Sequence, residues 1–228
     1  MKIKLLKWPL GLAKKIRKII ESGIPISFIA GISAIIIFWG FTLISMIFFP
    51  GKFNPTENWM SNLGNSNFNP KGAIFFNIGC IITGIALFPF YLGFFELRIG
   101  GSRNKRLTIL TQITGFFSAF TIIMIGVFPE DNFEIHAFWA AVLFFLTIPT
   151  LLLPSIALYK YDFTKTIAKY GFIATSINVL LWVFFVPIFE WLTIIFAFGF
   201  IGLIIEMMNR RIEKFRFIRQ NMKSTSKK

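Results

Sequence analysis

Residues that build disulfides and metal centres are nearly absent from this sequence. Its 228 residues include one cysteine, Cys80, and one histidine, His136. A single cysteine cannot form a disulfide within one chain. One histidine without paired cysteines leaves only carboxylates as further metal ligands. We therefore expect no disulfide framework, no metal site and no cofactor.

Acidic residues are also scarce. The chain has 10 Asp and Glu against 24 Lys and Arg, which gives a formal net charge of +14. Such an excess can indicate nucleic-acid binding, but here the basic residues lie almost entirely in short stretches between apolar runs. We therefore expect no nucleic-acid partner, and we take anionic lipid head groups as the counter-charge.

Apolar residues are abundant instead. They make up 55% of the chain, with 31 Phe and a mean hydropathy of +0.70, more than a soluble core of this size needs. A hydrocarbon core about 30 Å thick takes roughly 20 apolar residues per helix. Six segments qualify: 24–49, 72–94, 107–128, 137–159, 170–189 and 191–207. The sequence predicts an all-α, polytopic membrane protein, a bundle of six transmembrane helices.

Two features of the later segments involve proline. The last two segments are separated only by Glu190, with Pro187 just before it. Read as one helix, residues 170–207 would overshoot a bilayer, so we expect a tight hairpin at the membrane surface. Pro149 and Pro154 fall inside the fourth segment, where they favour a kink.

The basic residues predict the orientation of the chain, because Lys and Arg resist translocation. They concentrate at both termini and in the connections 96–106 and 160–169, whereas the alternate connections hold only Lys52 and Lys71. We expect both termini in the cytoplasm, and residues 50–71, 129–136 and Glu190 outside. The chain is then a multi-pass protein of the cell membrane.

Three parts follow from this topology. Residues 1–23 form a basic amphipathic juxtamembrane segment, 24–208 the six-span membrane domain, and 209–228 a basic cytoplasmic tail. The tail is expected to begin as a helix lying on the membrane surface, where it contacts anionic head groups. The oligomeric state is left open.

The first outer connection contains a predicted short helix. Thr56 can cap a helix over 57–63, and Gly64 is placed to end it in a left-handed conformation. The apolar face of this helix would carry Trp59, Met60 and Leu63. We expect it to lie at the outer interface.

The second segment begins with an Asn-Pro pair. Asn69 is a good N-cap and Pro70 suits the first helical position, so together they predict a helix start. Asn77 lies two turns into this helix. An amide facing lipid is costly, so Asn77 should face the interior of the bundle.

The second outer connection holds the only histidine. Asp131 and Glu134 have the spacing of a capping box at the start of the fourth segment. His136 would lie in the first turn of that helix, where the helix dipole favours a neutral ring. Its imidazole then suits a general base, a proton relay or a metal ligand, or equally a hydrogen bond that holds two helices together.

These two connections carry a resemblance to a known family. The run 58–64, Asn-Trp-Met-Ser-Asn-Leu-Gly, followed by Asn69-Pro70 and Phe76-Asn77, resembles the first-loop signature of the membrane family known as domain of unknown function 998 (DUF998). The run Phe-Pro-Glu-Asp at 128–131, with His136 beyond it, is similar to that family's second outer loop. The resemblance implies a six-span bundle without supplying a reaction.

A more distant likeness is to the Frag/DRAM/Sfk group. This group includes damage-regulated autophagy modulators and a protein that acts in the remodelling of GPI-anchor lipids, so the likeness hints at lipid. Its first loop has a comparable pattern of Ser, an acidic residue or amide, a small residue and Gly. Where the group tends to have Asp after the serine, this chain has Asn62.

The two connections open on the same predicted face, so their polar residues can form one site. The first hypothesis is an outer-facing pocket that binds a lipid head group, with amides donating hydrogen bonds and aromatic rings lining the acyl part. Its candidate binding residues are Asn58, Trp59, Asn62, Asn69, Asn77 and Glu130.

Two other functions are open. In an enzyme that transfers or hydrolyses a lipid acyl group, Ser61 would be the nucleophile, His136 the base and Asp131 the group that orients it. The sequence around Ser61 lacks the G-x-S-x-G pattern of a nucleophile elbow. The third function is a small-solute transporter. The sequence argues against it, because few ionisable residues lie near the membrane midplane.

Overall fold

The structure is a computed structural model that describes the backbone of residues 26–97 and 101–225, and the side chains of 26–95 and 101–210. The described part is all-α, as predicted. Its helices are α2 (Ile26–Ile47), α3 (Ala73–Leu92), α4 (Ser102–Val127), α5 (Phe133–Tyr159), α6 (Lys165–Phe184) and α7 (Pro187–Thr225). The short helices are η1 (Met60–Gly64), η2 (Gly93–Leu97) and η3 (Asp162–Thr164). The predicted juxtamembrane segment 1–23 lies outside the described residues.

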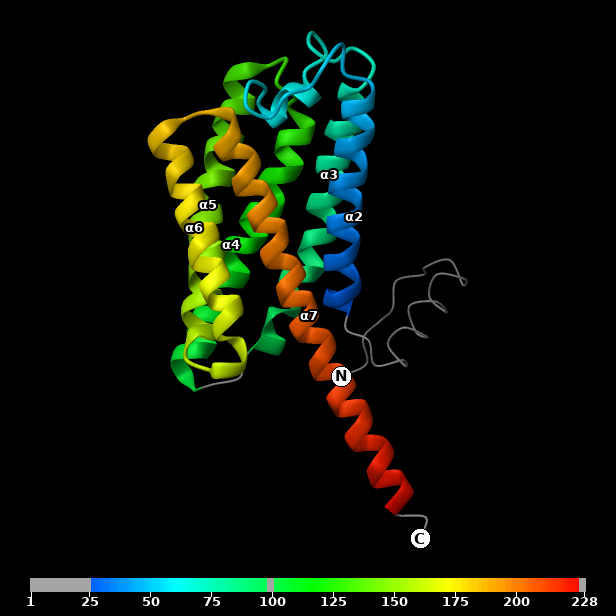
Figure 1. The fold of residues 1–228 in the computed structure, drawn as a ribbon, viewed down its shortest axis with the longest axis vertical. Helices are drawn as coiled ribbons and strands as arrows, with labels where there is room; N and C mark the ends of the chain where they lie inside the picture. The colour runs from blue at the N-terminus through cyan, green and yellow to red at the C-terminus, as the bar shows by residue number, and fades with distance from the viewer. Residues whose placement is uncertain (1–25, 98–100, 226–228) are drawn as a thin grey trace, which may run out of the picture.

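Six helices in the described part are long and apolar enough to cross a membrane, which confirms the predicted spans. Each packs against the next in sequence, and α7 packs back against α2, so that the six form a closed ring (Figure 1). Small buried residues, among them Ala34, Ala119 and Ala174, allow close helix contacts. Large apolar side chains such as Ile36, Phe117 and Phe145 point outward, as expected where lipid is the solvent.

The bundle has two different ends. The polar end carries the long loop (residues 48–72), the α4–α5 connection (128–132) and the α6–α7 turn (185–186). At the opposite end α2 begins, and α7 continues past the other helices (Figure 1). The side of the membrane that each end faces stays a prediction.

The turn between α6 and α7 differs from the prediction. The helix α6 ends at Phe184 because Phe185 adopts a left-handed conformation (φ 44°). Pro187 then begins α7. Proline suits the first turn of a helix because it lacks the backbone N–H that would be unpaired there. Glu190 therefore lies in the first turn of α7 and is buried, and not in the connection as the sequence suggested.

Three of the other helices begin before the predicted apolar segments, whereas α2 and α3 lie within theirs. The helices α4, α5 and α6 each begin four or five residues before the predicted segments, because polar residues can continue a helix outside the hydrocarbon. Pro149 and Pro154 lie inside α5. The helix α7 continues without a break through Thr225, so the described part of the tail, residues 209–225, is helical. Its role at the membrane surface stays a prediction.

Candidate functional site

The long loop is packed into the polar end of the bundle. Its only regular element is the 3-10 helix η1, which starts at Met60 and is shorter than the predicted helix over 57–63. Met60 and Leu63 are buried, at 1% and 0% exposure. Gly64 does not adopt the expected left-handed conformation. Glycine is needed there because a Cβ would lie 2.5 Å from Oδ1 of Asn77.

Asn69 holds the loop to α2. Its amide nitrogen donates to the carbonyl oxygens of Ser45 and Leu63, both at 3.1 Å, and to Oγ of Ser45 at 2.9 Å. Its Oδ1 accepts a hydrogen bond from the backbone N–H of Gly72 at 3.1 Å. Asn69 thus caps the turn that leads into α3, although α3 itself begins at Ala73.

Asn77 holds the loop to α3. It is buried, as predicted, and its amide nitrogen donates to the carbonyl oxygen of Gly64 at 2.9 Å. Trp59 packs against Phe185 of the α6–α7 turn, with ring centroids 5.0 Å apart. The backbone carbonyl of Asn58 accepts the indole N–H of Trp191 at 3.1 Å. The loop is therefore fixed to α2, α3 and α7.

Glu130 joins the loop to the α4–α5 connection. Its side chain is 8% exposed and accepts hydrogen bonds from Oγ of Ser61 at 3.1 Å, from the amide of Asn62 at 3.0 and 3.1 Å, and from the amide of Asn65 at 3.3 Å. All of these donors are neutral groups. The carboxyl group therefore has several hydrogen-bond donors, and no salt bridge to it is formed within the described residues.

The acidic residues after Glu130 do not form the predicted capping box. The N-cap of α5 is Asn132, and no side chain caps that helix. Asp131 instead accepts hydrogen bonds from the backbone N–H of Ser66, at 3.1 and 3.2 Å, and from its hydroxyl. Asp131 therefore bonds to the long loop and not to the first turn of α5, because the loop folds over the start of that helix.

His136 lies in the first turn of α5 and is 4% exposed. Its Nδ1 is 2.8 Å from the carbonyl oxygen of Phe128. A carbonyl can only accept, so Nδ1 carries the proton of this bond. No hydrogen bonds join Ser61, His136 and Asp131 in the described part, since Ser61 donates to Glu130 and Asp131 accepts from Ser66.

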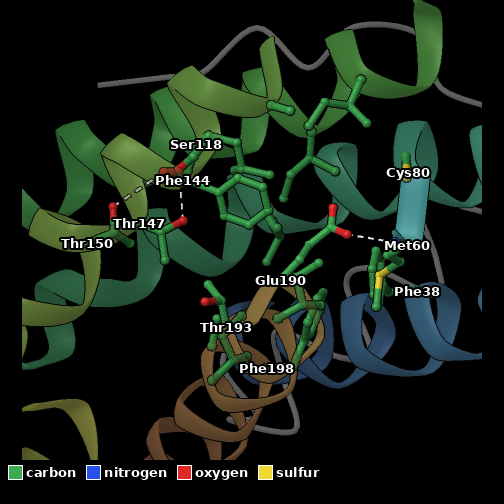
Figure 2. Close-up of a pocket in the computed structure, with 18 of the residues that line it drawn as sticks. Phe38, Met60, Cys80, Ser118, Phe144, Thr147, Thr150, Glu190, Thr193 and Phe198 are labelled. Carbon is green, nitrogen blue, oxygen red and sulfur yellow. Dashed lines mark hydrogen bonds between the residues drawn. The ribbon is translucent and has the colours of Figure 1, made fainter. Parts of the chain in front are cut away.

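A cavity runs inside the ring of helices, with η1 at one end (Figure 2). Its volume is about 110 Å³, on a scale where one enclosed water takes about 10–15 Å³. Along α7 its lining extends from Glu190 to Ile201, about 16 Å at 1.5 Å per residue. The helices α2, α3, α4, α5 and α7 line it with mostly apolar side chains, such as Phe38, Leu87, Phe90, Leu143, Phe198 and Ile201.

Glu190 lies at the end of the cavity beside η1. Its side chain is 6% exposed and points into the cavity (Figure 2). Its Oε2 accepts a hydrogen bond of 2.6 Å from the backbone N–H of Met60. One turn further along α7, Thr193 also lines the cavity. The hydroxyl of Thr193 is buried and has no hydrogen-bond partner in the structure.

The comparison with protein families matches residues 32–207 to the family described as "Protein of unknown function (DUF998)". The chain belongs to the DUF998 family. The match contains both connections on which the resemblance rested, and the described part of the cavity lining lies within it. No curated protein and no solved structure shows significant similarity to the chain. The comparisons give no support to the distant likeness to the Frag/DRAM/Sfk group.

Two of the predicted site residues of this DUF998 chain line the cavity, Ser61 and His136. The others hold the polar end together: Asn58, Trp59, Asn62, Asn69, Asn77, Glu130 and Asp131 make the contacts given above.

The sequence reasoning missed Glu190 and Thr193 as cavity residues. The available signal was Glu190 itself, a single acidic residue between two apolar runs. An ionisable residue inside a membrane span is by default a candidate for a functional site.

Proposed function

We propose that this protein binds a single-chain lipid or related amphiphile inside the bundle. The alkyl chain would occupy the cavity, and the polar head would lie at Glu190 and His136, beside η1. The shape and chemistry of the cavity carry this proposal: it is long, narrow and mostly apolar, and the carboxyl group of Glu190 and the imidazole of His136 belong to its lining, with Glu190 bonded to η1 at one end. Ligand sites typically combine an apolar lining with a few convergent polar groups.

The narrowness of the cavity favours one chain over two. Its volume of about 110 Å³ is spread over at least the stretch of α7 between Glu190 and Ile201. The cavity is therefore wide enough for one alkyl chain and not for two side by side. Hydroxyls part-way along, such as Ser118 and Thr150, bond to each other at 3.3 Å and do not demand a ligand. The head group is therefore expected at the end beside η1.

This proposal differs from the head-group pocket expected from the sequence in one respect. The amides of Asn62, Asn69 and Asn77 already donate to protein acceptors, so they are not free for a ligand. The head group would instead meet Glu190, Ser61 and His136. If the basic residues orient the chain as predicted, this end faces the outer side of the membrane.

Binding is favoured over acyl transfer. A serine nucleophile needs a base within hydrogen-bond reach. The hydroxyl of Ser61 donates to Glu130 at 3.1 Å, and among the described residues no hydrogen bond joins it to His136. A hydrolase would therefore require the loop to rearrange around Ser61.

Photo-crosslinking tests the proposal directly. The full-length protein is placed in phosphatidylcholine nanodiscs with a hexadecanol that carries a diazirine in mid-chain, and the labelled residues are located by mass spectrometry. We expect labels on cavity residues such as Leu87, Ile122 and Phe198. Labelling confined to outward-facing residues such as Phe117 and Phe145 would overturn the proposal.

Two neighbouring alanines of α5 give matched variants. Ala140 lines the cavity, whereas Ala141 is exposed on the lipid-facing side. Ala140→Phe should fill the cavity and remove most of the internal labelling, and Ala141→Phe should leave it unchanged. Equal internal labelling of the two variants would also overturn the proposal.

A further inference from the structure

The polar end of the cavity offers a ligand hydrogen-bond acceptors. Glu190 accepts the N–H of Met60 with Oε2, and in the described part its other oxygen has no hydrogen bond. His136 uses Nδ1 for the carbonyl of Phe128, so a neutral ring presents the lone pair of Nε2. A head group that fits this end must therefore donate hydrogen bonds.

Two buried carboxyl groups lie at this end, and no Lys or Arg among the described residues forms a salt bridge with either of them. Glu130 and Glu190 are both buried, and the described lining of the cavity contains no Lys or Arg. The salt bridges of the described part lie at the opposite end of the bundle, between Lys165 and Asp162 and between Arg210 and Glu206. A buried carboxylate is costly without a cation, so a cationic head group would stabilise the ionised form of Glu190, whereas a phosphate or carboxylate head group would be disfavoured.

Thr193 provides an independent observation. Its side chain is 1% exposed, it lines the cavity three residues after Glu190, and its hydroxyl has no hydrogen-bond partner among the residues that the structure describes. Buried hydroxyls are usually hydrogen-bonded. Other unpaired hydroxyls in the described part, such as those of Thr42 and Thr83, belong to residues outside the cavity lining, whereas Thr193 is part of it. A donor on a ligand head group at this end would complete the hydrogen bonding of Thr193. Figure 2 shows Thr193 and Glu190 together on the cavity side of α7.

We propose that this end of the cavity binds a primary ammonium group, so that the ligand is a single-chain primary amine. This inference rests on the proposed function and names the chemical class of its ligand. An ammonium group has three donors and no acceptor, which matches the carboxylate of Glu190, the hydroxyl of Thr193 and Nε2 of His136. A quaternary ammonium has the charge without the donors.

A metal ion fits this end less well. In the described residues, no three His, Cys, Asp or Glu side chains are grouped so as to hold one. Glu190 and His136 would supply two ligands at most, since Glu130 is already occupied by the hydroxyl of Ser61 and the amides of Asn62 and Asn65.

Competition against the crosslinking probe tests the inference. Hexadecylamine and hexadecanol are compared for the concentration that halves labelling of the cavity by the diazirine alcohol, in phosphatidylcholine nanodiscs. We expect the amine to compete at a concentration at least about tenfold lower, because hydrogen bonds to charged groups are among the strongest that proteins make. Hexadecyltrimethylammonium should compete no better than the alcohol.

Matched variants separate the site from general attraction of cations to the protein. Glu190→Gln and Thr193→Val should each reduce the preference for the amine over the alcohol, with Glu190→Gln bringing it to about twofold or less. Glu134 is exposed at the same end and does not line the cavity. Glu134→Gln should leave the preference unchanged, which also corrects for partitioning into the bilayer.

Each outcome decides something. No internal labelling by the alcohol probe overturns both the proposed function and this inference. Internal labelling with no preference for the amine, or with a preference that survives Glu190→Gln, overturns the inference alone and leaves amphiphile binding in place. Equal competition by the trimethylammonium compound would show that charge without hydrogen-bond donation selects the ligand, which also contradicts the inference.

Discussion

The backbone N–H of Met60 donates a 2.6 Å hydrogen bond to Oε2 of Glu190, 130 positions later in the chain. Both residues are buried, and both line the cavity. A buried backbone N–H requires an acceptor, so the carboxylate that faces the cavity also fastens η1 to α7. The closure of the polar end and the chemistry of the cavity thus depend on the same side chain.

Two replacements of Glu190, by Ala and by Gln, should distinguish its role as a hydrogen-bond acceptor from the role of its charge. Glu190→Ala leaves the N–H of Met60 unsatisfied, at a cost of about 1–3 kcal/mol, whereas the amide oxygen of Glu190→Gln can still accept. We expect the melting temperature of the detergent-purified protein to fall clearly more for Ala than for Gln. Equal losses would show that the hydrogen bond to Met60 contributes little.

Glu130 should govern the local stability of the long loop. Glu130→Ala removes the acceptor of Ser61, Asn62 and Asn65, and hydrogen bonds to charged groups contribute roughly 1.5–3 kcal/mol each. We expect amide hydrogen exchange over residues 61–66 to become at least about tenfold faster. Glu134→Ala, at an exposed position on the same end, is the control, and similar exchange in the two variants would contradict the role of Glu130.

Gly72 should be intolerant of a side chain. A Cβ there would lie 2.6 Å from the carbonyl oxygen of Ser45, a backbone atom of α2, and against the amide of Asn69. We expect Gly72→Ala to lower the melting temperature. Gly40 has nothing within 4 Å of the corresponding position, so Gly40→Ala should be neutral or stabilising, by up to about 1 kcal/mol. The reverse order would show that the loop is not packed on α2 as described.

The predicted orientation can be tested by cysteine labelling. Asn67 lies exposed on the long loop and Arg103 is exposed at the opposite end, while the single native thiol, Cys80, is buried. A membrane-impermeant maleimide applied to intact cells should label Asn67→Cys directly and Arg103→Cys only after permeabilisation. The opposite pattern would invert the topology inferred from the basic residues.

The sequence predicted local features well where a local rule decides them. Asn77 was expected to be buried because an amide facing lipid is costly, and it is. Pro187 shows the limit of such rules. It lay inside the fifth predicted segment, just before the expected hairpin turn, but it begins α7, because the left-handed Phe185 had already ended α6. That difference moved Glu190 from a connection into the bundle.

The partners of the polar side chains could not be predicted from spacing. Asp131 and Glu134 have the spacing of a capping box, yet Asp131 bonds to Ser66. The alternative enzyme hypothesis required Ser61 to bond to His136, whereas Ser61 bonds to Glu130. Each of these bonds joins residues more than sixty positions apart, so no local pattern in the sequence encodes it.

The sequence by itself determined the number of spans and the need for helices, because hydrocarbon leaves a backbone no partner outside its own segment. The tertiary structure decided that the six helices close into a ring around a cavity, and that η1 covers one end of it. It also decided that Glu190 and Thr193 face that cavity. These outcomes depend on how the six helices rotate and pack against one another, which hydropathy along the chain does not specify.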